Sequence, residues 1–378
     1  MRYRFHEGPE TATHRAIDAW WRAFTASSSQ IAGLFRRQNK FDLVGFMHEH
    51  LRAVDERLMW EFGPALRGGA HRLIITPERQ RHLRPLVDLT LARAPKDSPF
   101  EFYYGRQSEP RKLIEATVEG RTDLTIDGWK VAVKTNERLG LEFLVVPRRD
   151  QLTDEKVVGG AMIAVESTLG ETFLDAHCDS IEVSSDEANA VPLEDLEAHM
   201  RTVLERTHAK LPDAPLHEFG EFQWTLFKLK PEPAEDFPHQ ADLFLAKTAH
   251  VPMWQVAHMG GFSSERFSRF GETFCFVKID WKDFSRDRVE GKQELEDALQ
   301  NALQPKGLGA VISGGTGLRY SYIDLALPNV ERAVPIIRDV LRKSGVPKRT
   351  WLLFYDDALA AEWVGISDDS PEPPGLPD

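Results

Sequence analysis

The clearest hydrophobic pattern in the chain lies between residues 272 and 357, where strand-like and helix-like periodicities follow one another. Four segments there are rich in alternating apolar and β-branched residues, as strands are, and two have apolar residues every three or four positions, as helices have. We expect strand 273–281, helix 292–303, strand 307–313, strand 318–327, helix 329–344 and strand 350–355. The glycine-rich run 314–317 predicts a hairpin turn between the second and third strands.

This β-α-β-β-α-β order is that of the split βαβ, or ferredoxin-like, arrangement, and we place such a domain at residues 266–367. Its first and third strands should lie side by side at the sheet centre, where period-two alternation assigns side chains to opposite faces. The face toward the two helices should carry Cys275, Val277, Ile279, Ile323, Leu325 and Leu327. The opposite face, which we call the candidate binding face, should carry Phe276, Lys278, Asp280, Tyr320, Tyr322 and Asp324.

Three interpretations of the candidate binding face remain open. The face is buried beneath residues 220–260 or against a second copy of the chain, or it binds a protein partner, or its aromatic rings stack on RNA bases as in RNA-recognition modules. RNA is the least favoured, because Asp280 and Asp324 would repel phosphates and the aromatic ribonucleoprotein motif is absent.

Residues 1–187 predict a mixed α+β module, so the fold class is α+β. Helices are expected over 11–54, 77–94, 112–116 and 153–169, the second of them with Thr76 as its N-cap. Strands are expected at 58–62, 72–75, 101–104, 121–126, 129–134, 140–147 and 180–183. Residues 188–265 form a connecting region with a helix over 192–210 and a strand over 222–230. Residues 368–378 are an acidic, proline-rich tail that we expect to be disordered.

Composition narrows the classes of function mainly by exclusion. The chain has 378 residues, 42% of them hydrophobic and 28% charged, as expected for a globular protein of several domains. The net charge of -12 disfavours nucleic acid as a partner. No segment approaches the ~18 consecutive apolar residues of a membrane-spanning helix, and residues 1–15 lack the apolar core of a signal peptide. With two distant cysteines, Cys178 and Cys275, that we expect to be free thiols, the sequence predicts a cytoplasmic protein without membrane association.

Candidate chemistry is sparse. His177 and Cys178 lie near Asp175 and Asp179, but no second His or Cys follows at the spacing of a zinc site, so we expect a structural role. The glycine-rich run lacks the Lys-Ser/Thr pair of a phosphate-binding loop. The sequence therefore indicates no catalytic residue, no metal ligand and no cofactor.

Two further groups of residues are expected to serve the fold alone. The adjacent Trp20 and Trp21 predict packing in a core and against a neighbouring element. Four arginines of the helix expected at 77–94 are spaced like a solvent-exposed helix face: Arg79, Arg81, Arg84 and Arg93.

Several short stretches carry a resemblance that covers most of the chain. They lie at residues 59–64, 71–76, 93–95, 100–103, 169–171, 224–227 and 322–324. In these stretches the chain resembles a family of uncharacterised bacterial proteins, which implies a bacterial origin but no activity. The C-terminal domain is also similar, in topology and acidity, to the regulator of ribonuclease activity B, an acidic ferredoxin-like protein that inhibits an endoribonuclease by binding it.

The leading hypothesis from the sequence is a non-enzymatic, regulatory protein that binds a protein partner or self-associates. Its basis is the acidic surface, the absent catalytic signatures and the candidate binding face. One alternative is a hydrolase-type enzyme with its site in a cleft between the domains. A pocket lined by several of Asp175, His177, His250 and His258 would support this alternative. Another alternative is an immunity protein for a toxin.

Overall fold

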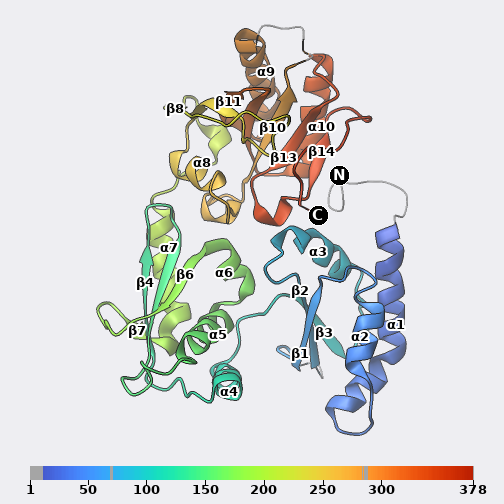
Figure 1. The fold of residues 1–378 in the computed structure, drawn as a ribbon, viewed down its shortest axis with the longest axis vertical. Coiled ribbons are helices and arrows are strands. Elements are labelled where there is room, and N and C mark those ends of the chain that lie inside the picture. The colour runs from blue at the N-terminus through green and yellow to red at the C-terminus, as the bar shows by residue number, and fades with distance from the viewer. Residues whose placement is uncertain (1–11, 69–70, 283, 285–287, 378) are drawn as a thin grey trace.

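The structure, a computed structural model, describes residues 12–68, 71–282, 284 and 288–377. The described strands form three sheets, of three, four and seven strands. Figure 1 shows the sheets in three separate units, with the seven-stranded sheet above the other two. The predicted α+β class is confirmed. The expectation of no signal peptide falls largely on residues 1–11, which lie outside the described residues.

The N-terminal unit, residues 12–104, packs helices against a small three-stranded sheet. Its helices are α1 (Ala12–Phe35), α2 (Leu43–His50) and α3 (Arg84–Ala92), and its strands are β1 (Met59–Pro64), β2 (His71–Thr76) and β3 (Phe100–Tyr104). Strands β1 and β2 form an antiparallel pair, and β3 runs parallel to β2. Trp20 and Trp21 are both buried, and Trp21 Nε1 donates a hydrogen bond to Thr90 O at 2.7 Å.

The helix expected to begin at Pro77 begins later, after a turn and the short 3-10 helix η1 (Arg81–Leu83). Thr76 does not cap a helix. Its Oγ1 accepts a hydrogen bond from Glu78 N at 2.9 Å and donates one to Glu171 Oε1 at 2.5 Å. Glu78 has a positive φ of 48°, which interrupts helical geometry before Arg84.

The middle unit surrounds a four-stranded sheet of order β6-β5-β4-β7. Its strands are β4 (Lys130–Thr135), β5 (Leu141–Val146), β6 (Cys178–Val183) and β7 (Val191–Pro192), and its helices are α4 (Arg111–Thr122), α5 (Val157–Leu169), α6 (Glu171–His177) and α7 (Leu196–His208). The strand expected at 121–126 is absent, because α4 continues to Thr122 and Asp123 caps it in the left-handed conformation.

The domain boundary expected at residue 187 needs correction. It falls between β6 and β7, two strands of the same sheet, and α7 packs into the core of that sheet. Residues 12–187 also contain two separate cores, one in the N-terminal unit and one in the middle unit. The sequence pattern located these elements but not the sheet to which each belongs, because pairing between distant strands leaves no local periodicity.

The C-terminal unit has a seven-stranded sheet of order β14-β13-β10-β12-β11-β9-β8. Its elements are β8 (Thr225–Lys228), β9 (Leu243–Thr248), α8 (Val251–Ala257), β10 (Thr273–Asp280), α9 (Arg288–Leu303), β11 (Ala310–Gly317), β12 (Tyr320–Leu327), α10 (Val330–Lys343), β13 (Thr350–Phe354) and β14 (Trp363–Gly365). Elements β10 to β13 follow the expected β-α-β-β-α-β order, with β10 and β12 paired antiparallel. Strands β9 and β14 and helix α8 were not expected from the sequence.

The glycine-rich run does not form the expected turn. Residues 314–317 lie inside β11, between β12 and β9, and the chain turns at Leu318 and Arg319. A Cβ atom on Gly314 would lie 2.6 Å from Tyr322 O, and one on Gly315 would lie 2.6 Å from Leu245 O. The strand therefore needs glycine there because the backbones of both neighbours approach closely.

The acidic segment 368–377 is ordered against the C-terminal unit, contrary to expectation. Asp368 Oδ1 pairs with Arg338 Nη2 at 2.6 Å and with Arg342 Nη2 at 2.7 Å, both on α10. Pro371 O accepts a hydrogen bond from Trp351 Nε1 at 2.6 Å. The composition of the segment predicted disorder because it does not show the arginine and tryptophan partners, which lie 20 or more residues earlier in the chain.

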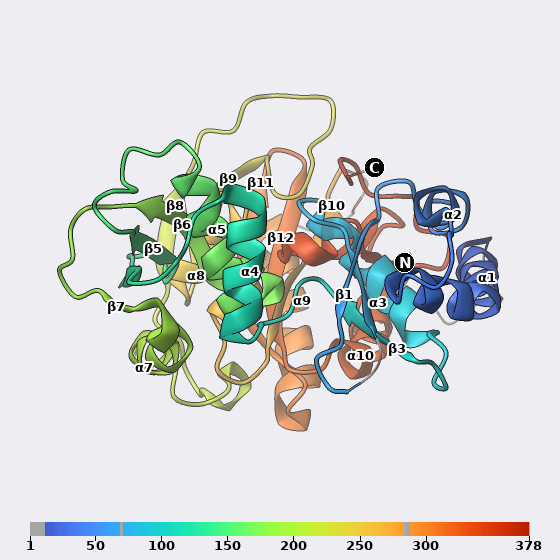
Figure 2. The ribbon, with the colours of Figure 1, turned by 90° about the horizontal axis from the view of Figure 1, so that it is seen from below.

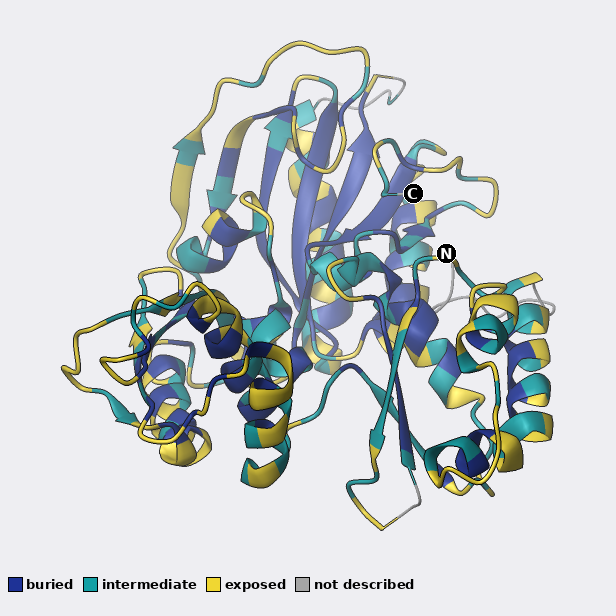
Figure 3. Cartoon of the chain, turned by 60° about the horizontal axis from the view of Figure 1, so that its bottom comes forward, coloured by how far each residue is buried: buried dark blue, intermediate teal, exposed yellow. Residues whose placement is uncertain are grey.

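Buried residues concentrate in the central strands of the seven-stranded sheet, as Figure 3 shows, whereas its edge strand β8 is mostly exposed. The view from below in Figure 2 shows the N-terminal and middle units on opposite sides of the molecule, with strands of the C-terminal unit between them. No single helix among the described residues is long and apolar enough to span a bilayer; α5 and α6 would pass only as a pair, bent by 102°.

Candidate functional site

The candidate binding face has the predicted register but not the predicted exposure. Cross-strand pairing sets Phe276 opposite Asp324, Lys278 opposite Tyr322, and Asp280 opposite Tyr320. The helix-facing residues of β10 and β12 lie in the core beneath α9 and α10, as expected. All six residues of the candidate binding face, however, are at most 1% exposed. Burial beneath preceding residues, the first of the three interpretations, is the one that the structure shows.

The face is covered by a segment that the sequence described only as loop and connecting region. Asp242, fully buried, accepts hydrogen bonds from Arg319 N at 2.8 Å, from Tyr320 N at 2.9 Å and from the hydroxyl of Tyr322. Lys278 Nζ donates to Phe237 O and lies 4.1 Å from the centre of the Tyr320 ring. Burial lowers the pKa of Lys278 to about 8. The tyrosines and the lysine therefore hold the covering segment in place.

The end of this face carries an ion-pair network. Asp280 Oδ2 lies 2.7 Å from Arg319 Nη2 and 2.9 Å from Arg349 Nε. Arg349 Nη2 also pairs with Asp236 Oδ2 at 2.8 Å. Burial alone would raise the pKa of Asp280, but the hydrogen bonds from both arginines hold it below its usual value. The charges that would have faced a partner are thus neutralised within the chain.

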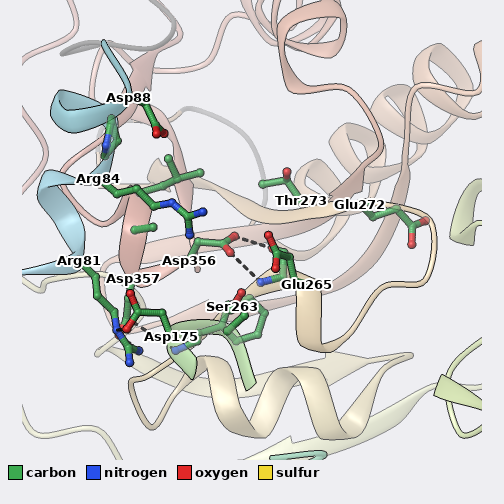
Figure 4. Close-up of a pocket in the computed structure, with 17 residues that line it drawn as sticks. Arg81, Arg84, Asp88, Asp175, Ser263, Glu265, Glu272, Thr273, Asp356 and Asp357 are labelled. Carbon is green, nitrogen blue, oxygen red and sulfur yellow. Dashed lines mark hydrogen bonds and ion pairs between the residues drawn. The ribbon is translucent and has the colours of Figure 1, made fainter. Parts of the chain in front are cut away.

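A cavity of about 360 Å³, which we call the junction cavity, lies where the three units meet (Figure 4). Residues of η1 and α3 line it from the N-terminal unit, and Asp175 and Ala176 line it from the middle unit. The C-terminal unit contributes residues 262–265, 271–273 and 356–359. Its lining contains six carboxylates and two arginines. The six carboxylates belong to Asp88, Asp175, Glu265, Glu272, Asp356 and Asp357.

Two arginines that the sequence assigned to a solvent-exposed helix face instead line this cavity. Arg81 Nε lies 3.0 Å from Asp175 Oδ1, and its Nη1 lies 3.8 Å from Asp357 Oδ2, so one side chain connects all three units. The guanidinium of Arg84 lies 4.9 Å from the centre of the Tyr104 ring. Figure 4 shows both arginines directed toward the aspartates. Arg93 is also paired, with Asp18 at 2.8 Å.

Asp356 forms the polar base of the junction cavity. Its Oδ1 accepts a hydrogen bond from Ser264 N at 2.7 Å, and its Oδ2 accepts one from Ser264 Oγ at 2.5 Å. Ser264 Oγ in turn accepts a hydrogen bond from Phe274 N at 2.9 Å. Although part of the residue reaches the cavity, burial raises the pKa of Asp356 to about 6. The serine hydroxyl is fully engaged in the fold and is not arranged as a nucleophile.

The other residues singled out from the sequence have structural surroundings. Burial lowers the pKa of His177 to about 4 and raises the pKa of Cys178 to about 11, so both are neutral at pH 7. His250 caps α8 by accepting a hydrogen bond from Met253 N. Both cysteines are free thiols, as expected. Within the described ranges, no group of three His, Cys, Asp or Glu side chains is arranged to hold a metal ion.

Most residues of the junction cavity were not identifiable from the sequence. Asp175 was considered only for its proximity to His177, and Arg81 only as a charge on a helix face. Ser264, Asp356 and the loop around them lie in no motif. The cavity is formed by segments that lie more than 80 residues apart in the chain, so no local sequence pattern predicts it.

Comparisons with known proteins do not add to this picture. No protein-family model, no curated protein and no solved structure matches the chain.

Proposed function

We propose that the protein acts by binding rather than by catalysis, and that it captures a basic segment of a partner protein at the junction cavity. The observation that carries this proposal is the predominance of carboxylates in a cavity built from three separately packed units. Cavities at domain interfaces are common ligand sites, and a lining of one predominant charge attracts the opposite charge.

The size and charge of the cavity support a cationic side chain as the part that enters. A volume of about 360 Å³ accommodates a lysine or arginine side chain with some of its neighbours. Arg81 offsets only part of the charge of Asp175 and Asp357. Glu265 and Asp88 are exposed at the cavity, where a basic group can approach them from solvent.

The hydrolase-type alternative receives less support from the geometry. Of the four residues on which that alternative depended, only Asp175 lines the junction cavity. The partly buried His177 and the buried His250 are neutral imidazoles at pH 7. The hydroxyl of Ser264 is committed to Asp356 and Phe274 N. A toxin immunity protein would be a binding protein of the proposed kind, provided that the toxin presented a basic segment.

A charge-reversal experiment tests the proposal. Fluorescence anisotropy would measure the binding of a labelled oligolysine peptide and a labelled oligoglutamate peptide to the full chain. We expect the oligolysine to bind and the double variant Glu265→Lys/Asp88→Lys to weaken it about tenfold or more, through the loss of about 1.4 kcal/mol of attraction. Oligoglutamate should not bind the wild-type protein.

A matched control separates the cavity from the overall charge. Glu197→Lys/Glu232→Lys makes the same change in net charge at two exposed positions outside the cavity. We expect this variant to retain most of the affinity for oligolysine. Equal weakening in both double variants would show a non-specific charge effect and would refute the proposed site.

A further inference from the structure

A second cavity, which we call the sheet-face cavity, lies beside the candidate binding face and has a different character. It has a volume of about 320 Å³ and lies between α8, the segment 238–241 and strands β10 and β13. Its wall is largely apolar, with Pro238 and Ala257 at the surface and the fully buried Phe276 behind them. Phe276 is the one residue predicted for the binding face that lines it.

A chain of hydrogen bonds fixes one wall of the sheet-face cavity. Gln240 Nε2 donates to Asp324 Oδ1 at 3.0 Å and to the Tyr355 hydroxyl at 2.7 Å. Gln240 Oε1 lies 3.1 Å from His258 Nε2, and His258 Nδ1 lies 2.7 Å from Trp254 O. Gln240 is therefore held by partners at both ends of its amide. Such a network keeps a polar wall in one orientation before any ligand arrives.

The two remaining polar groups at the cavity are His239 and Asp357. His239 has a left-handed φ of 41°, a conformation that costs energy for a non-glycine residue and that is often found at ligand sites. The side chain of His239 is exposed to solvent, and one of its ring nitrogens can accept a hydrogen bond. Partial desolvation and the nearby Lys278 lower the pKa of His239. The Asp357 carboxylate accepts hydrogen bonds from Gly261 N at 3.0 Å and from Phe262 N at 3.3 Å.

We propose that the sheet-face cavity binds a small aromatic amine, with its ring against the accessible apolar wall at Pro238 and Ala257 and its amine directed to His239 and Asp357. The apolar wall supplies contact for a ring, because an apolar surface removed from water stabilises the complex. An ammonium group can donate to both the imidazole nitrogen and the carboxylate, whereas a carboxylate on the same ring would be repelled by Asp357. This site is distinct from the proposed capture of a basic segment, although Asp357 borders both cavities.

Three compounds with the same ring provide the test: phenethylamine, 2-phenylethanol and phenylacetate. Titration calorimetry and ligand-observed NMR on the full chain would measure their binding. We expect phenethylamine to bind with a Kd of about 1 mM or below, as a ligand of its size can, with the alcohol weaker and the acid weakest. Strongest binding of phenylacetate would overturn the inferred head group, and absence of binding by all three would overturn the site.

Substitutions then locate the binding. Ala257→Leu adds a larger side chain to the cavity wall and should weaken phenethylamine at least tenfold, whereas Gln255→Leu, at an exposed position of the same helix, should not. His239→Gly removes the imidazole at a position whose backbone suits glycine, so the protein should stay folded while binding weakens. Unchanged affinity in both Ala257→Leu and His239→Gly would place the amine elsewhere and refute the proposal.

Discussion

Lys278 lies in the middle of the seven-stranded sheet, and its burial should make the stability of the protein depend on pH in the alkaline range. The pKa of Lys278 falls from the ordinary 10.5 to about 8, because burial penalises the ammonium. At 1.36 kcal/mol for each pH unit, the charged lysine costs the folded state about 3 kcal/mol at neutral pH. Lys278→Met should remove this cost together with the hydrogen bond to Phe237 O, which contributes about 1 kcal/mol.

The sign of the pH dependence follows from proton binding. Between pH 8 and pH 10.5 the unfolded chain keeps its proton on Lys278 while the folded chain has released it, so the free energy of unfolding rises with pH. Up to pH 9.5 this gain amounts to about 2 kcal/mol. Above that pH the tyrosines complicate the measurement, because burial raises the pKa of Tyr322 well above the ordinary 10.0 and deprotonation would favour the unfolded chain.

Urea titrations at pH 7.0, 8.0, 9.0 and 9.5, followed by circular dichroism, provide the assay. We expect the free energy of unfolding of Lys278→Met to fall behind that of the wild-type protein by about 2 kcal/mol between pH 7.0 and pH 9.5. The two thiols, whose raised pKa values lower stability over the same pH range, are common to both proteins and cancel in this difference. Lys343→Met is the control, because Lys343 is exposed on α10 and should leave the pH dependence as it is. An identical pH dependence in wild-type protein and Lys278→Met would refute the inference that the buried ammonium is penalised.

Two further predictions concern the contacts that hold covering segments onto the C-terminal unit. Asp242→Ala should lower the free energy of unfolding by about 3–6 kcal/mol, because it leaves Arg319 N, Tyr320 N and the Tyr322 hydroxyl without their acceptor. Asp242→Asn should lower it by about half as much. Urea titration at pH 7 would compare the two variants. Asp368→Ala/Asp369→Ala should cost less than about 1 kcal/mol, because these ion pairs are exposed, yet it should speed cleavage at Glu372 by a glutamate-specific protease. Mass spectrometry would follow that cleavage, and a rate equal to that of the wild-type protein would contradict the role given to the two aspartates.

Local periodicity was enough to predict the faces of the central strands, because alternation is a property of each strand by itself. Cys275 and Val277 therefore appear on the side of the helices, and Phe276 and Lys278 on the other side. Exposure depends on segments elsewhere in the chain. The carboxylate that secures the cover, Asp242, lies in no motif, and its partners are about 80 residues away.

The junction cavity shows even more clearly that local sequence patterns do not predict contacts between distant segments. Arg81 looked like a solvent-exposed charge because its partners, Asp175 and Asp357, are about 90 and 280 residues further along the chain. The prediction of disorder for segment 368–377, made from its composition, was wrong because Asp368 forms ion pairs with arginines on α10. Charges that satisfy one another across a fold are indistinguishable in sequence from charges that face water.

The glycines of β11 offer a practical way to recognise distant relatives of this protein. The backbone oxygens of Tyr322 and Leu245 exclude any side chain at Gly314 and Gly315, and the Asp242 carboxylate occupies the space beside Gly317. A chain that builds the same sheet must keep these spacings whatever the rest of its sequence has become. A search weighted toward this glycine pattern and an acidic residue about 75 positions before it should therefore detect homologues that overall identity fails to reveal.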